Sequence, residues 1–406
     1  MTFAESEPGR RFRFFGFFLW ILPLVGVCVM VALDPVRRSV TPVFHLAAER
    51  WWAGGELYAD VRGYHYLPQF ALLFAPFHAL PVPVGDILWR AISVGLVLWG
   101  IASLVGLALP ADTGRGFFYA CLLALAPCLG AVRNGQTNLA FGGLCLLLAC
   151  FLAASRWKSA AVCLVALVAV KPLGLVLILL APWVYRPLIR PLAIGLAVLA
   201  AIPFAFARPE YAMAQYRAAG EHLAGWSGTV EHRFADLTAL LRTAGLSLGG
   251  LGSLMLRGVA AIIALGFWLV GAARTREPWR AATLVLISTI YLMLFNPMTE
   301  KNSYAIVAPV FAVCAVACLA DERTRHFGWL LVLAVVSIGI FPELFWRIDK
   351  GFGLWWDPLI VTAVGAALAA RIATNQPPPA VAEPWRAPDP NPLPPGKGAR
   401  RGGQLP

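Results

Sequence analysis

The chain has 406 residues, of which 59% are hydrophobic and only 13% are charged. Soluble domains average roughly 45–50% apolar and about 25% charged residues, so the composition excludes an ordinary soluble domain. The formal net charge of +12 would point to nucleic acid in a soluble chain. Here the arginines lie in short loops between apolar runs and in the C-terminal tail, where Lys and Arg set membrane topology. We therefore expect a membrane protein with no nucleic-acid partner.

The apolar runs are long, continuous and without the period-two alternation of a barrel strand, so they predict helices. A crossing needs about 20 mainly apolar residues. The predicted spans are 14–33, 66–80, 86–109, 116–132, 138–154, 159–183, 190–207, 253–273, 281–295, 303–320, 327–342 and 356–373. The fold class is therefore all-α, a polytopic transmembrane protein of about 11–12 membrane segments. The run 66–80 is the weakest, because Pro68 and Pro76 bracket a brief apolar stretch, and it is expected to be a broken or re-entrant helix buried in protein.

The placement of Lys and Arg predicts the domain organisation. Residues 1–13 form a cytoplasmic N-terminus, 14–374 the transmembrane domain, and 375–406 a Pro-rich, disordered cytoplasmic tail. The run 14–33 is expected to be an uncleaved first span rather than a signal peptide. Two long loops, 34–65 and 208–252, fall outside. Arg156 and Lys158 would also fall outside, a conflict that a non-crossing 66–80 segment would resolve.

All eight cysteines lie in apolar runs without a Cys-X-X-Cys or Cys/His cluster. They are predicted to be small buried hydrophobes rather than disulfides or a zinc site. No glycine-rich nucleotide-binding motif occurs, and no metal or cofactor is expected.

The first outer loop begins at Asp34 and ends on an aromatic stretch, Tyr64-His65-Tyr66. Its residues 43–53 carry apolar side chains at helical spacing, which predicts an amphipathic helix lying in the membrane interface. Gly54-Gly55 would end that helix. The alternative is an ordinary interfacial helix with solvated charges.

A second polar cluster, Asn134-Gly135-Gln136-Thr137-Asn138, stands between two apolar runs. Its amides supply donors and acceptors suited to sugar hydroxyls or a phosphate. The alternative is a helix–helix turn with capping asparagines.

Two further clusters carry charge. Lys171-Pro172 lies within the run 159–183, where a cation is costly unless it is paired or faces water. At a proline break facing a cavity it would suit a phosphate; the alternative is a lysine snorkelling from a span end. Glu300-Lys301-Asn302 follows another span, and the neighbouring lysine can keep the carboxylate ionised as a proton acceptor. The alternative there is a surface ion pair of little consequence.

In this order the clusters resemble glycosyltransferase family 87, the polyprenyl-phosphomannose-dependent mannosyltransferases with the GT-C membrane fold. The resemblance covers about residues 14–345 and rests on Gly54-Gly55 with Tyr58 and on the segments 64–68, 134–138, 171–172 and 296–302. It implies a GT-C-like, multi-pass enzyme of the bacterial plasma (inner) membrane. Such an enzyme transfers a hexose, mannose being the best-known, from a polyprenyl phosphate to a lipid or glycan acceptor at the outer face, with inversion.

In this family a loop carboxylate after the first span is the general base, usually at the head of the interfacial helix. Here the corresponding residues 38–42 contain no acid. The nearest carboxylate is Asp34; Glu49, Glu56 and Asp60 are fallbacks, and Glu300 could serve from another loop. The expected catalytic residues are Asp34 and Glu300. The expected substrate-binding residues are Tyr64, His65, Tyr66, Asn134, Gln136, Asn138, Lys171, Lys301 and Asn302.

The competing hypothesis is a membrane protein without catalysis, either an inactive relative or a lipid-sugar carrier. Transporters usually show paired halves with matching broken helices, and no such halves are evident here. An ion channel would need repeated rings of pore-lining polar residues, which the sequence also lacks.

Overall fold

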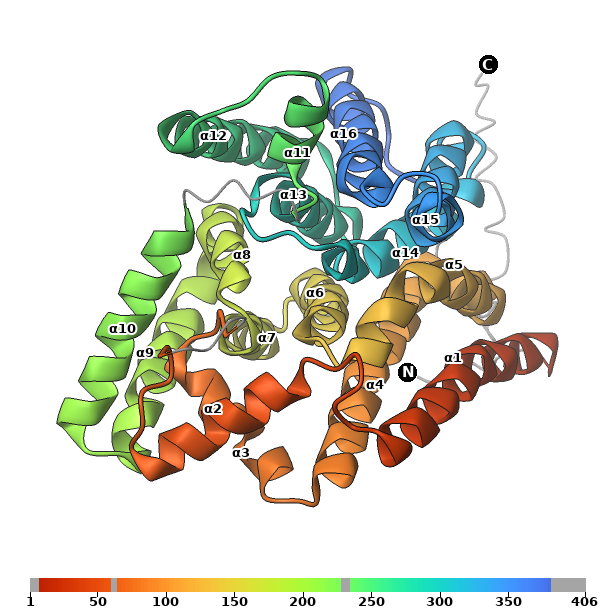
Figure 1. Ribbon diagram of the computed structural model, residues 1–406. Helices are drawn as coiled ribbons and strands as arrows, with labels where there is room; N and C mark the ends of the chain where they lie inside the picture. Colours follow the sequence, from red (N-terminus) through yellow and green to blue (C-terminus); the bar gives the residue numbers. More distant parts are fainter. Residues whose placement is uncertain (1–6, 60–63, 228–233, 381–406) are drawn as a thin grey trace, which may run out of the picture.

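The computed structural model describes residues 7–59, 64–227 and 234–380 (Figure 1). Within these ranges the chain forms α-helices and short 3-10 turns, without a strand. The predicted all-α fold is confirmed. The helices are α1 Glu7–Leu33, α2 Thr41–Ala53, α3 Pro68–His78, α4 Val82–Ala108, α5 Thr113–Asn134, α6 Thr137–Ala153, α7 Trp157–Val170, α8 Leu175–Leu180, α9 Ile189–Phe206, α10 Pro209–Ser227, α11 Leu237–Thr243, α12 Gly250–Arg274, α13 Trp279–Phe295, α14 Ala308–Leu319, α15 Arg325–Phe345 and α16 Phe352–Ala373. The predictions for residues 1–6, for Asp60 and for 381–406 lie outside the described residues.

Seven described helices are long and apolar enough to cross a membrane: α1, α4, α5, α9, α12, α15 and α16. Shorter apolar helices make up the rest of the bundle. Large apolar side chains such as Phe14 on α1 and Ile262 on α12 are 64% and 73% exposed. Exposed apolar surface of this kind suits contact with lipid. The chain is a multi-pass membrane protein.

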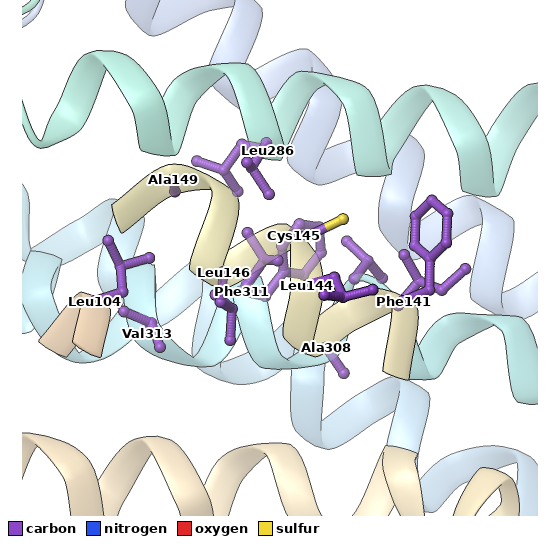
Figure 2. Packing of buried hydrophobic residues seen from close by; sticks show 14 of the residues in the cluster. Leu104, Phe141, Leu144, Cys145, Leu146, Ala149, Leu286, Ala308, Phe311 and Val313 are labelled. Carbon is purple, nitrogen blue, oxygen red and sulfur yellow. The ribbon is translucent and has the colours of Figure 1, made fainter. Parts of the chain in front are cut away.

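Helix α6 is the centre of the bundle, because 15 of its 17 residues are buried. Figure 2 shows its side chains, among them Phe141, Leu144 and Leu146, packed among residues such as Leu286 of α13 and Phe311 of α14. Helices packed on every side cannot tilt or slide without opening voids. The position of the α6 N-terminus is therefore fixed by the core.

Helix α3 is the segment expected as a broken span. It has 11 residues, roughly 16 Å at 1.5 Å per residue, while the hydrocarbon core is about 30 Å thick. Phe70 and Phe74 of α3 are fully buried against Phe44 of α2. The helix is continuous rather than broken, but it is too short to cross and, as expected, it packs within the protein. Helix α2 also forms as predicted and ends at Gly54, which is left-handed at φ 69°. Its face with Phe44 and Trp51 is buried in the protein.

The run 159–183, expected as one span, is instead two helices, α7 and α8, separated at Lys171-Pro172. Proline lacks an N–H and disfavours a helical conformation in the residue before it; Lys171 is accordingly extended, with φ −161° and ψ 135°. The chain then doubles back, since the rings of Trp157, which begins α7, and Tyr185, which follows α8, lie 6.1 Å apart. Lys171 is therefore at the tip of a helical hairpin.

Because α3 is short and α7 and α8 form a hairpin, the loops are distributed between the two ends of the bundle differently from the predicted topology. The Tyr185 hydroxyl donates to Glu277 Oε1 over 2.8 Å, and Trp279 packs with Ala108 and Ala317. These contacts gather the start of α7, the start of α13 and the ends of α4 and α14 at one end, with Arg156 beside them. The basic residues in the loops and helix ends there include Arg156, Lys158, Arg186, Arg190, Arg274, Arg276, Arg280, Arg323 and Arg325. Arg156 and Lys158 thus join the other loop arginines, and the topological conflict disappears.

Candidate active site

A cavity of about 570 Å³ lies at the opposite end of α5, α7 and α13 from these arginines. Segments far apart in the sequence line it: residues 39–44, 65–66, 136–138, 171–173 and 296–303, with contributions from Leu223 and Phe234. All four polar clusters of the sequence therefore contribute to one cavity.

A chain of hydrogen bonds crosses this cavity from a cation to a carboxylate. Lys171 Nζ donates to Asn138 Oδ1 over 2.8 Å, and Asn138 Nδ2 donates to Gln136 Oε1 over 2.8 Å. Gln136 Nε2 then donates to Glu300 Oε2 over 3.4 Å. Asn138 also donates to the backbone carbonyl of Asn302 over 3.2 Å. The two amides hold Lys171 and Glu300 on either side of the α6 N-terminus.

The N-terminus of α6 opens into the same cavity, which Gln136, Thr137 and Asn138 line. The N-cap residue, Gln136, makes no side-chain bond to the first-turn N–H groups. Such N–H groups, with the positive end of the helix dipole, attract anions. Together with the Lys171 ammonium they make this corner suited to a phosphate. Among the described residues, no group of three or more His, Cys, Asp or Glu side chains is placed to hold a metal ion.

Glu300 is the carboxylate of the cavity; of the described residues that line it, no other is acidic. A capping box fixes its position: the Glu300 N–H donates to Ser303 Oγ over 3.1 Å, and its side chain accepts the Ser303 N–H. Its orientation is therefore set before a substrate arrives.

Aromatic and imidazole groups form another wall. His65 Nδ1 lies 3.0 Å from His222 Nε2, with the rings stacked, and burial lowers the pKa of His222. The Tyr66 hydroxyl lies 3.3 Å from Thr137 Oγ1, and burial raises the pKa of Tyr66. Both groups are therefore neutral hydrogen-bonding partners near pH 7.

Six of the expected site residues line the cavity: His65, Tyr66, Gln136, Asn138, Lys171 and Glu300. Tyr64 lies fully buried beside Tyr66 and supports this wall. Asn134 contributes its backbone carbonyl, which accepts the Val40 N–H over 2.9 Å.

The remaining expected residues lie elsewhere. Asp34 is exposed, and its Oδ1 accepts the Arg37 N–H over 3.2 Å. Lys301 pairs with Glu343 at the surface. Asn302 contacts the site through its backbone carbonyl.

The prediction from sequence missed a buried ion pair on α4, formed by Asp86 and Arg90. Both side chains are almost inaccessible, with Arg90 Nη1 3.6 Å from Asp86 Oδ2. Arg90 also donates to the carbonyls of Val132 and Arg133, each over 3.1 Å, and so holds the last turn of α5 before Gln136. The sequence does contain a signal for this pair, because an acidic and a basic residue stand four positions apart within an apolar run.

The multi-pass helical fold thus holds a cation, a helix N-terminus and a carboxylate around one polar cavity, an arrangement suited to a membrane-embedded enzyme of group transfer. The model of glycosyltransferase family 87 matches residues 64–297, more than half of the chain. The chain belongs to this family, as its sequence clusters predicted, and is a glycosyltransferase. No curated protein matches it. The matched region includes Lys171 and the α6 N-terminus, and it leaves Asp34 and Glu300 outside.

Proposed function

We propose that this glycosyltransferase transfers a hexose, with mannose as the first candidate, from a polyprenyl phosphate to a lipid or glycan acceptor. The transfer occurs with inversion at the outer face of the bacterial plasma membrane. The observation that carries the proposal is the pairing of Lys171 with Asn138 at the N-terminus of α6.

This corner suits the leaving group of the reaction. When the bond between the sugar C1 and the phosphate oxygen breaks, the phosphodiester becomes a monoester and gains negative charge. Lys171 and the first-turn N–H groups of α6 are in place before that charge develops, so they stabilise it without reorganisation. Asn138 keeps the ammonium directed at the cavity.

The surroundings suit a lipid-borne donor. An apolar groove of about 590 Å³ runs between α3 and α9, lined by side chains such as Leu72, Leu199 and Phe206. It includes Ala169, two residues before Lys171. A polyprenyl chain in this groove would enter from the bilayer with its phosphate at Lys171.

The two carboxylates expected as the general base, Glu300 and Asp34, differ in their position relative to the cavity. Glu300 lines the cavity and is proposed to contact the sugar or the acceptor directly. Asp34 would reach the cavity only after a rearrangement of residues 34–38. The site end of the bundle lies opposite the arginine-rich short loops, which face the cytoplasm in inner-membrane proteins, and this supports transfer on the outer side.

The test is a transfer assay with the purified full chain in lipid nanodiscs. Radiolabelled polyprenyl-phosphomannose is supplied with an extract of bacterial membrane lipids and glycans, and the release of polyprenyl phosphate is measured together with labelled product. We expect release that depends on the extract. A protein that binds the donor but never releases polyprenyl phosphate would be the non-catalytic carrier. Transfer from nucleotide sugars instead would contradict the donor class.

A further inference from the structure

A chain of hydroxyl groups leads from the cavity wall to a buried carboxylate on α4. Ser39 lines the cavity, and its Oγ lies 2.7 Å from Thr41 Oγ1. Thr41 Oγ1 donates to Asp86 Oδ2 over 2.6 Å. The side chains of Thr41 and Asp86 are both fully buried, so Ser39 is where this chain reaches the cavity.

The hydrogen-bonding partners determine the direction of each proton. A hydroxyl has one proton to donate, and that of Thr41 goes to the Asp86 carboxylate. Ser39 must therefore donate to Thr41. The Ser39 oxygen meanwhile accepts from Arg90 Nη2 over 2.9 Å and from the Thr41 N–H over 3.3 Å. Every proton in the chain is directed away from the cavity and toward Asp86.

The chain continues beyond the carboxylate toward the surface. Asp86 Oδ1 lies 3.0 Å from His45 Nε2, and His45 Nδ1 lies 3.2 Å from His78 Nδ1. His78 is half-buried at the end of α3. An ionised carboxylate only accepts hydrogen bonds, so His45 donates its Nε2–H to Asp86 and the two imidazoles help to hold the carboxylate in place.

We propose that Ser39, Thr41 and Asp86 form a proton relay for the glycosyl transfer, an inference that rests on the proposed function. The acceptor oxygen forms its bond to the sugar C1 as the bond from C1 to the phosphate oxygen breaks, and the electron pair of that bond stays on the phosphate. The acceptor hydroxyl takes the place of the long, 3.3 Å contact from the Thr41 N–H on Ser39 Oγ. Its proton then moves to Ser39 Oγ, that of Ser39 moves to Thr41, and that of Thr41 moves to Asp86, which becomes a neutral carboxylic acid.

The location of Asp86 favours this role. An ionised group within a membrane helix is expensive and usually functional. Asp86 is separated from the cavity by only two hydroxyls. Arg90 offsets its charge, with Nη1 3.6 Å from the same Oδ2 that accepts the hydrogen bond from Thr41. The same network also ties α2 to α4, so the test must separate proton transfer from structural support.

The variant Thr41→Val breaks the relay with little change of shape, while Thr41→Ser keeps the hydroxyl. Thr289→Val is the matched control, because Thr289 is also fully buried and its hydroxyl bonds only to backbone carbonyls of α13. Ser39→Ala, at a half-buried position, serves as a second relay variant. The readouts are kcat and KM for polyprenyl-phosphomannose in the nanodisc assay, binding of polyprenyl phosphate, and the melting temperature.

A group that takes a proton in the transition state contributes about 10²- to 10⁴-fold. We expect Thr41→Val and Ser39→Ala to lower kcat about 100-fold or more while KM and polyprenyl phosphate binding stay near the wild-type values. Thr41→Ser should restore most of kcat, and Thr289→Val should match the wild type.

Three results would overturn the relay. They are a wild-type kcat in Thr41→Val, a loss in Thr41→Val that Thr41→Ser shares, or a loss of kcat in Glu300→Gln when both relay variants stay active. A wild-type protein that releases no polyprenyl phosphate would overturn the proposed function itself.

Discussion

The Nζ of Lys171 donates a 2.8 Å hydrogen bond to the Oδ1 of Asn138 and joins the tip of the α7–α8 hairpin to the first turn of α6. The hairpin tip exists because Pro172 breaks a long apolar run, and the first turn of α6 is fixed by the packing around that helix. A cation held in this way needs no rearrangement to meet a phosphate.

Replacing Lys171 with methionine should weaken polyprenyl phosphate binding roughly 10- to 100-fold, because a hydrogen bond to a charged group is worth about 1.5–3 kcal/mol. Binding is measured by titration in nanodiscs. Lys158→Met is the matched control, since Lys158 is exposed at the opposite end of α7. Equal losses in the two variants would mean that general charge attraction, rather than this site, holds the phosphate.

Glu300→Gln should lower kcat/KM about tenfold, mainly through KM, because a substrate hydroxyl loses a charged acceptor worth about 1.5–3 kcal/mol. Glu343→Gln should stay within about twofold of the wild type, since its pair with Lys301 is at the surface, where such pairs contribute at most about 1 kcal/mol. Steady-state transfer kinetics distinguish them. A Glu300→Gln enzyme with wild-type kinetics would remove this residue from the site.

Gly143→Ala should destabilise the fold by about 1–3 kcal/mol through overpacking. A Cβ at Gly143 would lie 2.6 Å from the carbonyl carbon of Leu96 on α4, and backbone cannot move aside as a side chain can. Gly95→Ala should be neutral or stabilising by up to about 1 kcal/mol, because nothing lies within 4 Å of its Cβ position. Unfolding in detergent compares the two; similar melting temperatures would contradict close α4–α6 packing.

Acidification should destabilise the protein through His222. Burial lowers the pKa of His222 below its ordinary value of 6.5, so the folded state binds fewer protons than the unfolded state just below that pH. The free energy of unfolding is then retained above about pH 6.5 and falls as the pH drops below it. Melting curves between about pH 5 and 7.5 should be less pH-dependent in His222→Gln than in the wild type. The exposed His326 is the control, and an equal change in His326→Gln would contradict the assignment.

The sequence by itself determined the features that depend on local physics. Continuous apolar runs require helices because lipid cannot satisfy a free backbone. Pro172 breaks its run, and Gly54 ends α2, because their backbone preferences do not depend on the rest of the fold. The ordered polar clusters were enough to identify the family.

Only the tertiary structure decided how those pieces combine. A run of apolar residues has the same pattern whether it crosses the membrane or doubles back, so the hairpin at Lys171 had to come from packing. The hydrogen bond from Thr41 at the head of α2 to Asp86 on α4 joins residues 45 positions apart. Contacts at that separation depend on how α2 and α4 pack against α5 and α6, which no local pattern encodes.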